Sequence, residues 1–273
     1  MSHSTHESQR YAEQPKADEE SPASNEQVNE SSAPKKEPAK QDKAVGNVEM
    51  QNKHEEISRE PVSGSGEIER VKAKKEDIAL TFDAGASAEP TDSILKTLAK
   101  HSLHVTFFLT GKWCEQNPDL VKRILAEGHE IGNHTYDHKD LRKLSNSAIA
   151  EEFTKMNALV KNATGLDTAA LARPPYGGRD ARVLKLMHEN GYVPIYWSVD
   201  SWDAFKTGIT STEIKNRVLS KVRGGDIVLM HCGSRPTADA LNEIIEGLQA
   251  KGYKVVTRSE ERRVGKECRS RWS

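Results

Sequence analysis

The stretch IALTFDAGAS, residues 78–87, joins a short apolar run to a carboxylate and then breaks. The run from Ile78 to Phe82 has the length and apolar character of a buried strand, and Gly85 ends it. Packing alone does not require a carboxylate at the end of such a strand, so Asp83 needs another explanation. In folds built on parallel strands, ligands bind at the carboxyl ends of the strands. The stretch therefore predicts a first buried strand and a first candidate functional residue.

Six more apolar runs follow, alternating with amphipathic stretches. In one such stretch Ile149, Phe153 and Met156 recur at steps of four and three, which is the spacing of one helix face. Strict alternation of strands and helices predicts a parallel sheet with helices outside it. The expected fold class is α/β, a distorted, incomplete (β/α) barrel of about seven parallel strands, with an open doubly wound sheet as the alternative. The expected strands are Asp77–Phe82, His104–Leu109, His129–Gly132, Ala170–Arg173, Tyr192–Ser198, Asp226–Met230 and Tyr253–Thr257.

Composition divides the chain into three parts. Residues 1–75 are rich in Glu, Lys, Ser, Gln, Asn and Pro, and a segment of this kind buries too little apolar surface to offset its conformational entropy. We therefore expect a disordered polar segment or linker there, followed by one domain over residues 76–260. Residues 261–273, ERRVGKECRSRWS, lose all amphipathic pattern and are expected to be a non-native tail. A basic tail for an anionic polymer is the alternative for this segment.

Charge and hydropathy exclude some functions. The net charge is −1, from 40 basic and 41 acidic residues, which gives no electrostatic basis for binding nucleic acid. No stretch approaches the ~20 apolar residues of a membrane span. MSHSTHESQR, residues 1–10, lacks the apolar core of a signal peptide, which taken literally indicates a cytoplasmic protein. The three cysteines show no CxxC spacing, which argues against a disulfide framework and a zinc ribbon.

Chemically capable side chains follow the expected strands, where turns usually hold Gly, Asn, Ser or Asp. Because the carboxyl ends of parallel strands share one rim, these side chains are expected to converge, and their kinds indicate an enzyme. In chain order they are Asp83, His134, His138, Arg173, Asp200, Asp203 and His231.

Each local motif allows a structural explanation as well as a functional one. In GNHTYDH, residues 132–138, His134 and His138 could face one way on a helical turn as half of a metal site, but an HxxxH pair alone is a weak signal. Arg173, before the prolines of ARPPYGG, could hold a carboxylate or simply lie on the surface. Trp202 could be a core residue or a platform for a sugar ring.

Taken together and in this order, TFDAG, HTYDH, RPPYG, DSWD and LMH resemble the motifs of the polysaccharide deacetylases, the NodB-homology family or carbohydrate esterase family 4. The resemblance extends over residues 78–260. It implies a distorted β/α barrel, in agreement with the alternation of strands and helices. It also implies a hydrolase that removes acetyl groups from N-acetylated or O-acetylated sugars with a bound divalent metal, often zinc.

The resemblance assigns roles on the base side of the site. Asp83 stands at the position of the general base, and Arg173 at that of the arginine that orients the base. His134 and His138 stand at the two metal-binding histidines. A base and a metal together suit the attack of water on an acetyl carbonyl.

Further roles fall on the acid side. His231 matches the general acid, and Asp203, with Asp200 as the alternative, matches the aspartate that tunes it. The backbone N–H of Tyr176 would help to bind the oxyanion, and Leu229 would line the pocket for the acetyl methyl group. A free amine leaves poorly unless it is protonated, so a histidinium held by a carboxylate completes the reaction.

The sequence departs from the family pattern at two positions. The second aspartate after the base, a metal ligand in the family, is Ala84 here, so Asp83 could have to serve as a ligand as well. The tryptophan that follows the last aspartate of the fourth motif is Ala204, although Trp202 lies two residues earlier and could contact the sugar. These departures leave the third metal ligand and the substrate groove open.

The resulting expectation is a metal-dependent deacetylase of N-acetylated glycans, with bacterial peptidoglycan or a chitin-like polymer as substrate. Zinc is the expected metal, with cobalt, nickel and manganese as alternatives, and the protein is expected to be a monomer. By resemblance it would be extracellular or associated with the cell wall. Two alternatives stay open: a glycan-binding pseudoenzyme that has lost its metal through Ala84, and a hydrolase of C–N bonds in small cyclic amides.

Overall fold

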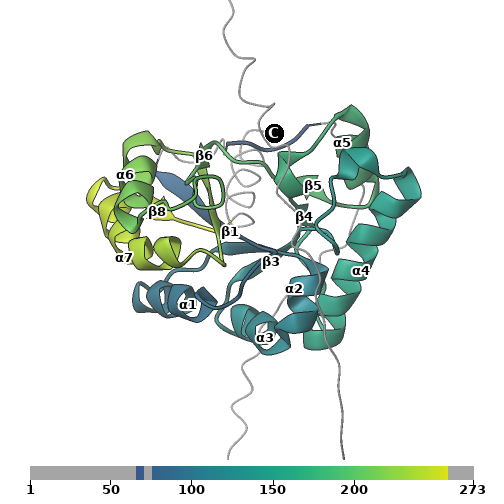
Figure 1. The fold of residues 1–273 in the computed structure, drawn as a ribbon, viewed down its shortest axis with the longest axis horizontal. Helices are drawn as coiled ribbons and strands as arrows, with labels where there is room; N and C mark the ends of the chain where they lie inside the picture. Colours follow the sequence, from purple (N-terminus) through teal and green to yellow (C-terminus); the bar gives the residue numbers. More distant parts are fainter. Residues whose placement is uncertain (1–65, 71–75, 258–273) are drawn as a thin grey trace, which may run out of the picture. The chain divides into compact units, whose positions relative to one another are not determined.

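A parallel β-sheet curls around the centre of the domain, and the helices pack against its outer face in the computed structural model (Figure 1). The structure describes residues 66–70 and 76–257. The sheet order is β5-β4-β3-β2-β1-β7-β6, and β8 pairs with β1. The strands are β1 Asp77–Ala84, β2 Thr106–Leu109, β3 Glu130–Asn133, β4 Leu171–Ala172, β5 Val193–Pro194, β6 Val199–Asp200, β7 Ile227–His231 and β8 Lys254–Val255. The helices are α1 Thr91–Lys100, α2 Gly111–Gln116, α3 Pro118–Ala126, α4 Asn146–Thr164, α5 Ala181–Glu189, α6 Ser211–Lys221 and α7 Arg235–Ala250, with 3₁₀ turns at Leu141–Lys143 and Pro175–Gly177.

The predicted fold class, an incomplete barrel of parallel strands, is confirmed. One expected strand is wrong, because only Val193–Pro194 of Tyr192–Ser198 forms a strand, β5, and the next strand, β6, begins at Val199. Pro194 has no N–H for a ladder, and beyond it Tyr196 and Trp197 stack on each other at a centroid distance of 4.0 Å. The chain therefore crosses from one edge of the sheet to the other at this point. The barrel is incomplete between β5 and β6, its two edge strands.

The central strand β1 is buried along all eight residues, and its side chains alternate between two environments. Phe82 belongs to the large apolar cluster that includes residues of the surrounding helices. Ala79 belongs to a smaller cluster with Phe108 and Ile227 of the neighbouring strands. Asp83 comes four residues after Ala79 and therefore shares its face of the strand. It lies on the inner face, at the carboxyl end of β1.

Among the described residues, none of the helices has the length and hydropathy of a membrane span.

Residues 66–70 lie against the barrel at the seam between its edge strands. The N–H of Ile68 donates to the carbonyl of Pro194 at 2.9 Å, and the N–H of Tyr196 donates to the carbonyl of Ile68 at 2.9 Å. Arg70 bridges to Asp226, next to β7, and its guanidinium lies 3.0 Å from that carboxylate. The side chain of Ile68 packs on the inner apolar cluster. The packed chain thus begins before residue 76, while the expected tail, residues 261–273, lies outside the described residues.

These contacts predict a difference between two truncations. Removing residues 1–65 is expected to leave the melting temperature nearly unchanged, as composition indicates. Removing residues 1–72 deletes an apolar contact and two backbone hydrogen bonds, which together contribute about 2 kcal/mol. For a domain of this size, that free energy corresponds to a decrease of about 5 °C in the melting temperature, which calorimetry can measure. Equal melting temperatures for the two truncated chains would show that this segment does not stabilise the barrel.

Candidate active site

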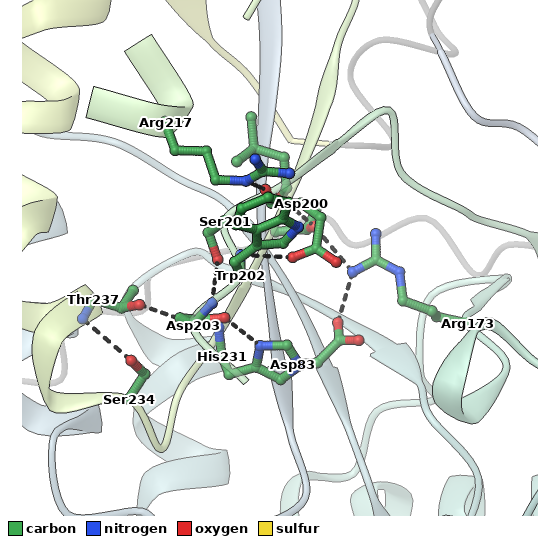
Figure 2. A network of polar contacts seen from close by, with 12 residues as sticks. Asp83, Arg173, Asp200, Ser201, Trp202, Asp203, Arg217, His231, Ser234 and Thr237 are labelled. Carbon is green, nitrogen blue, oxygen red and sulfur yellow. Dashed lines mark hydrogen bonds and ion pairs between the residues drawn. The ribbon is translucent and has the colours of Figure 1, made fainter. Parts of the chain in front are cut away.

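Asp83 shares its carboxylate with a buried arginine. Nη1 of Arg173, which is fully buried at the end of β4, donates to Oδ1 of Asp83 at 2.6 Å and to the hydroxyl of Thr81 at 3.0 Å (Figure 2). The guanidinium lies 4.2 Å from the ring centroid of Phe108, and its Nη2 donates to the carbonyl of Tyr196 at 3.2 Å. These contacts fix the arginine in place, so that its charge balances one oxygen of Asp83 and leaves Oδ2 available.

Two neutral imidazoles lie next to that available oxygen. Nδ1 of His134 is 2.8 Å from the carbonyl of Arg173, which can only accept, so this nitrogen carries the proton. The lone pair of His134 is therefore on Nε2, 3.5 Å from Oδ2 of Asp83. The ring of His138 lies 4.8 Å from that of His134. Burial lowers the pKa of His134 and, with the neighbouring imidazole, lowers that of His138 to about 3, so both are neutral at neutral pH.

A second pair of residues, His231 and Asp203, lies beside Asp83, because His231 pairs with Asp83 on the neighbouring strand β7 (Figure 2). Nδ1 of His231, at the end of β7, is 2.7 Å from Oδ1 of Asp203. Oδ2 of Asp203 accepts from the N–H of His231 at 2.8 Å and from the hydroxyl of Thr237 at 2.6 Å. Burial acts to lower the pKa of His231, but the Asp203 carboxylate outweighs it and raises that pKa to about 9. Burial acts to raise the pKa of Asp203, and His231 and these hydrogen bonds lower it overall.

The structure separates the two aspartates that the sequence left as alternatives. Asp203 contacts His231, whereas Asp200 accepts a hydrogen bond from the N–H of Trp202 at 2.7 Å. The charge of Asp200 also acts on Arg173, where it favours the protonated guanidinium. The carbonyl of Asp200 accepts from Nε of Arg217 at 2.6 Å. Asp200 therefore stabilises the loop that begins after β6 and the positive charge of Arg173.

Aromatic side chains line the rim beside these groups. Tyr176, Trp202 and Phe205 are exposed, and the ring of Tyr176 lies 4.6 Å from that of His138. One side of the Trp202 indole is covered by the guanidinium of Arg217, 3.2 Å from the ring centroid. Leu229 is buried two residues before His231 on β7 and shares its face of the strand. The site thus combines charged groups at its centre with an apolar and aromatic border.

Comparison with known proteins assigns this arrangement to a family. Residues 70–195 match the polysaccharide deacetylase family. A peptidoglycan-N-acetylglucosamine deacetylase of Bacillus cereus is 38% identical over 189 residues, which are 67% of this chain and 67% of that protein. The chain belongs to the polysaccharide deacetylase family. This confirms the family and the enzyme class predicted from the sequence motifs.

Other members of the polysaccharide deacetylase family show a range of function. Peptidoglycan-N-acetylglucosamine deacetylase PgdA of Listeria monocytogenes is 38% identical over 70% of this chain, which spans only 40% of that longer protein. A solved structure from Bacillus anthracis, described as a pseudoenzyme of carbohydrate esterase family 4, is 31% identical to this chain and has a TM-score of 0.68. The match covers 72% of this chain and 69% of the Bacillus anthracis chain. Family membership therefore coexists with both active and inactive sites among similar proteins.

The donor set of this deacetylase domain suits a divalent cation in its chemistry. His134 and His138 are neutral, and the N–H of His134 is fixed by a backbone carbonyl, as is usual for a metal-ligating imidazole. Asp83 supplies an anionic oxygen, but Ala84 carries only a methyl group and packs in the outer apolar cluster. Within residues 66–70 and 76–257, no three His, Cys, Asp or Glu side chains are grouped closely enough to hold a metal ion. The site thus holds two imidazoles and one carboxylate that is shared with an arginine.

Backbone strain is concentrated in the loops of the candidate site. Of the five described non-glycine residues with left-handed φ angles, four lie in these loops and one, Ser102, lies elsewhere. Such conformations cost about 1–2 kcal/mol for a residue with a Cβ, and they persist where surrounding contacts hold them. The four residues are Thr135, His138, Tyr176 and Trp202.

Several residues that support the site were not predicted from the sequence. Glu152, in the middle of α4, accepts hydrogen bonds from the backbone of the loop that carries His138. Thr237, at the start of α7, donates to Asp203, and Thr81 contacts Arg173. A carboxylate or hydroxyl on a helix or strand is common, and only the folded contacts distinguish these three from surface residues.

Proposed function

We propose that this domain hydrolyses the N-acetyl groups of a bacterial cell-wall glycan with a divalent cation bound by His134 and His138 and with Asp83 beside it as the base. The observation that carries the proposal is the presence of two differently paired groups on one rim. Asp83 is bound by the guanidinium of Arg173, while His231 is held as an imidazolium by Asp203. A carboxylic side chain that can act as a base and a histidine that can act as an acid, side by side on neighbouring strands, suit the hydrolysis of an amide.

The base side activates water. A cation at this position would act as a Lewis acid toward the acetyl carbonyl. Oδ2 of Asp83 takes the proton of the attacking water, and the guanidinium of Arg173 keeps the carboxylate oriented through Oδ1. The ring of Tyr176 lies beside His138, and the backbone N–H of this left-handed residue would donate to the developing oxyanion.

The acid side releases the product. With Nδ1 bound to Asp203, Nε2 of His231 gives its proton to the leaving amine. The pKa of about 9 keeps His231 protonated at neutral pH. Leu229, buried on the same face of β7, lines the space for the acetyl methyl group, and Trp202 offers an aromatic surface to a sugar ring.

Substrate class and location follow from the similar proteins. The Bacillus cereus and Listeria monocytogenes relatives are both peptidoglycan-N-acetylglucosamine deacetylases, so we propose peptidoglycan as the substrate and the cell wall as the place of action. A chitooligosaccharide deacetylase of Rhizobium leguminosarum is 34% identical, so chitin oligomers are the second substrate to test. Zinc is the proposed metal, because its usual ligands include imidazole and carboxylate.

Acetate release tests the proposal directly. The zinc-loaded and cobalt-loaded protein is incubated with peptidoglycan, chitin oligomers and acetylated xylan, and acetate is measured over time. Release is expected from peptidoglycan at the highest rate and is expected to disappear in Asp83→Asn. No release from any of the three substrates with either metal would instead support the second candidate, a glycan-binding pseudoenzyme. That candidate is favoured by one observation, the methyl group of Ala84 at a ligand position of the family.

A further inference from the structure

The loop that carries His138 has a strained backbone. Thr135 and His138 adopt left-handed φ angles of 68° and 59°, which residues with a Cβ seldom adopt. Local hydrogen bonds account for part of this conformation. The N–H of Thr135 donates to the side chain of Asn133 at 2.9 Å, and the N–H of His138 donates to the hydroxyl of Thr135 at 3.2 Å. A loop of this kind keeps its shape only if the surrounding structure holds it.

One side of the loop is held by the start of α2. The N–H of Gly111 donates to the carbonyl of Thr135 at 2.9 Å, and the N–H of Lys112 donates to the carbonyl of Tyr136 at 3.1 Å. These are N–H groups of the first turn of a helix, which have no partner within the helix itself. The carbonyls at the front of the loop are therefore satisfied from this side.

The other side of the loop is held by a single oxygen of Glu152. Its Oε2 accepts from the N–H of Tyr136 at 2.9 Å and from the N–H of Asp137 at 2.7 Å. The second oxygen, Oε1, is 3.3 Å from Nζ of Lys139, a half-exposed side chain. Glu152 is buried, with 6% of its surface exposed. Two consecutive backbone donors thus converge on one buried carboxylate, one residue before His138.

We propose that Glu152 is a positioning residue for His138. Its hydrogen bonds to Tyr136 and Asp137 fix the strained turn that directs the His138 imidazole toward His134. The part of this inference that concerns metal binding rests on the proposed function. A purely structural role, in which Glu152 only anchors α4 or pairs with Lys139, is the competing explanation.

Three substitutions separate these explanations. Glu152→Gln keeps an oxygen that can accept both N–H groups and removes the charge. Glu152→Asp keeps the charge but shortens the side chain by one methylene, so that its oxygens do not reach the loop. Glu152→Ala removes both. If hydrogen bonds to the loop are what matters, Gln resembles the wild type and Asp resembles Ala.

Asn157→Ala is the matched control. Asn157 lies on the same helix and likewise holds a loop, because its Oδ1 accepts from the N–H of Thr168 at 3.0 Å and from the hydroxyl of Thr168 at 2.9 Å. That loop precedes β4 and carries none of the candidate site residues. The control is expected to lower the melting temperature without changing metal affinity.

Two measurements are made on the full chain. Titration with Co²⁺, followed by its visible absorption, is expected to give an affinity about tenfold weaker for Glu152→Ala and Glu152→Asp, since supporting groups contribute at least this much at metal sites. Hydrogen exchange in the metal-free protein is expected to show faster exchange of the Tyr136 and Asp137 amides in these two variants. Glu152→Gln is expected to stay near the wild type in both.

The outcomes distinguish this inference from the proposed function. If the wild-type chain takes up no Co²⁺, the metal part of the proposed function fails, and the exchange rates of the two amides still decide the role of Glu152. Unchanged exchange in Glu152→Asp and Glu152→Ala would overturn the inference. It would also be overturned if Asn157→Ala weakened Co²⁺ binding as much as Glu152→Ala does. Should the alanine variant fail to fold, the comparison of Asp with Gln gives the same decision.

Discussion

His231→Ala is expected to lower turnover on the acetylated substrate about 10²–10⁴-fold, the usual contribution of a general acid, while metal content stays at the wild-type level. The reason is the geometry of the pair. Nδ1 of His231 is bound to Asp203, whereas the two imidazoles proposed as ligands, those of His134 and His138, lie next to each other, with His134 3.5 Å from Asp83. Acetate release measures the turnover, and elemental analysis of the same preparation measures the metal content. A variant that purifies without metal would make His231 a ligand and refute its role as the acid.

The pH profile gives a second measurement of this prediction. The pKa of His231 is raised to about 9, so the acid is protonated at neutral pH and is lost above about pH 9. Activity should therefore fall on an alkaline limb near pH 9. Asp203→Asn removes the charge that raises this pKa most, so that burial, which lowers it, is opposed only by the charges of Asp83 and Asp200. The alkaline limb is expected to move toward neutral pH in this variant. If it does not move, the limb reports a group other than His231.

Folding stability should follow the same pair. The folded-state pKa of His231 lies above its ordinary value of about 6.5, so the stabilisation is fully present below that value and is lost as the pH rises through about 9. The pKa of Asp203 is lowered on folding, so its contribution is lost as the pH falls through the folded value. Thermal unfolding at pH 7 and pH 10, in the wild type and in Asp203→Asn, measures the alkaline part of this effect.

Ala84→Asp is expected to tighten metal binding by about 10–100-fold, the range found for supporting groups at metal sites. Two neutral imidazoles leave the charge of a divalent cation to Asp83 alone, and that carboxylate is already shared with Arg173. A second carboxylate at the end of β1 supplies the missing charge. Competition with a chelator, measured for both forms, gives the change in affinity.

The packing of position 84 adds a second consequence. Ala84 is 1% exposed and belongs to the outer apolar cluster, so a carboxylate there is buried among apolar groups unless a cation pairs with it. The metal-free variant should melt below the wild type, and added metal should raise its melting temperature further than it raises that of the wild type. Ala84→Asn, which has the same shape without the charge, is the control and should not gain affinity. Destabilisation without any gain in affinity would show that position 84 faces the core only.

The sequence was sufficient for the fold class because β–α alternation is a regular signal. Ile78, Leu80 and Phe82 mark a buried strand by their spacing alone, and Gly85 marks its end. The end of β5 at Pro194, inside the expected strand Tyr192–Ser198, was not predicted, because an apolar run has the same composition whether it continues or crosses to another edge of the sheet. The attachment of residues 66–70 was also hidden, since a single isoleucine in a polar segment carries no periodicity.

For the site, the sequence named candidate residues, and the structure shows the partners of each. Asp200 and Asp203 are the same residue type three positions apart, so the sequence cannot distinguish them. The fold shows that Asp203 is the one that contacts His231. Glu152 could not be found at all. On an amphipathic helix a glutamate is the expected surface residue, and its burial follows from a loop sixteen residues earlier in the chain.

The left-handed residues of the active-site loops also bear on how this protein could be engineered. Glycine relieves the strain of such positions, so a screen for heat resistance would favour it at Thr135, His138, Tyr176 and Trp202. Each such gain would remove a side chain that faces or supports the rim. Directed evolution for thermal tolerance and selection for catalysis should therefore choose opposite residues at these four positions, while the rest of the barrel stays open to improvement.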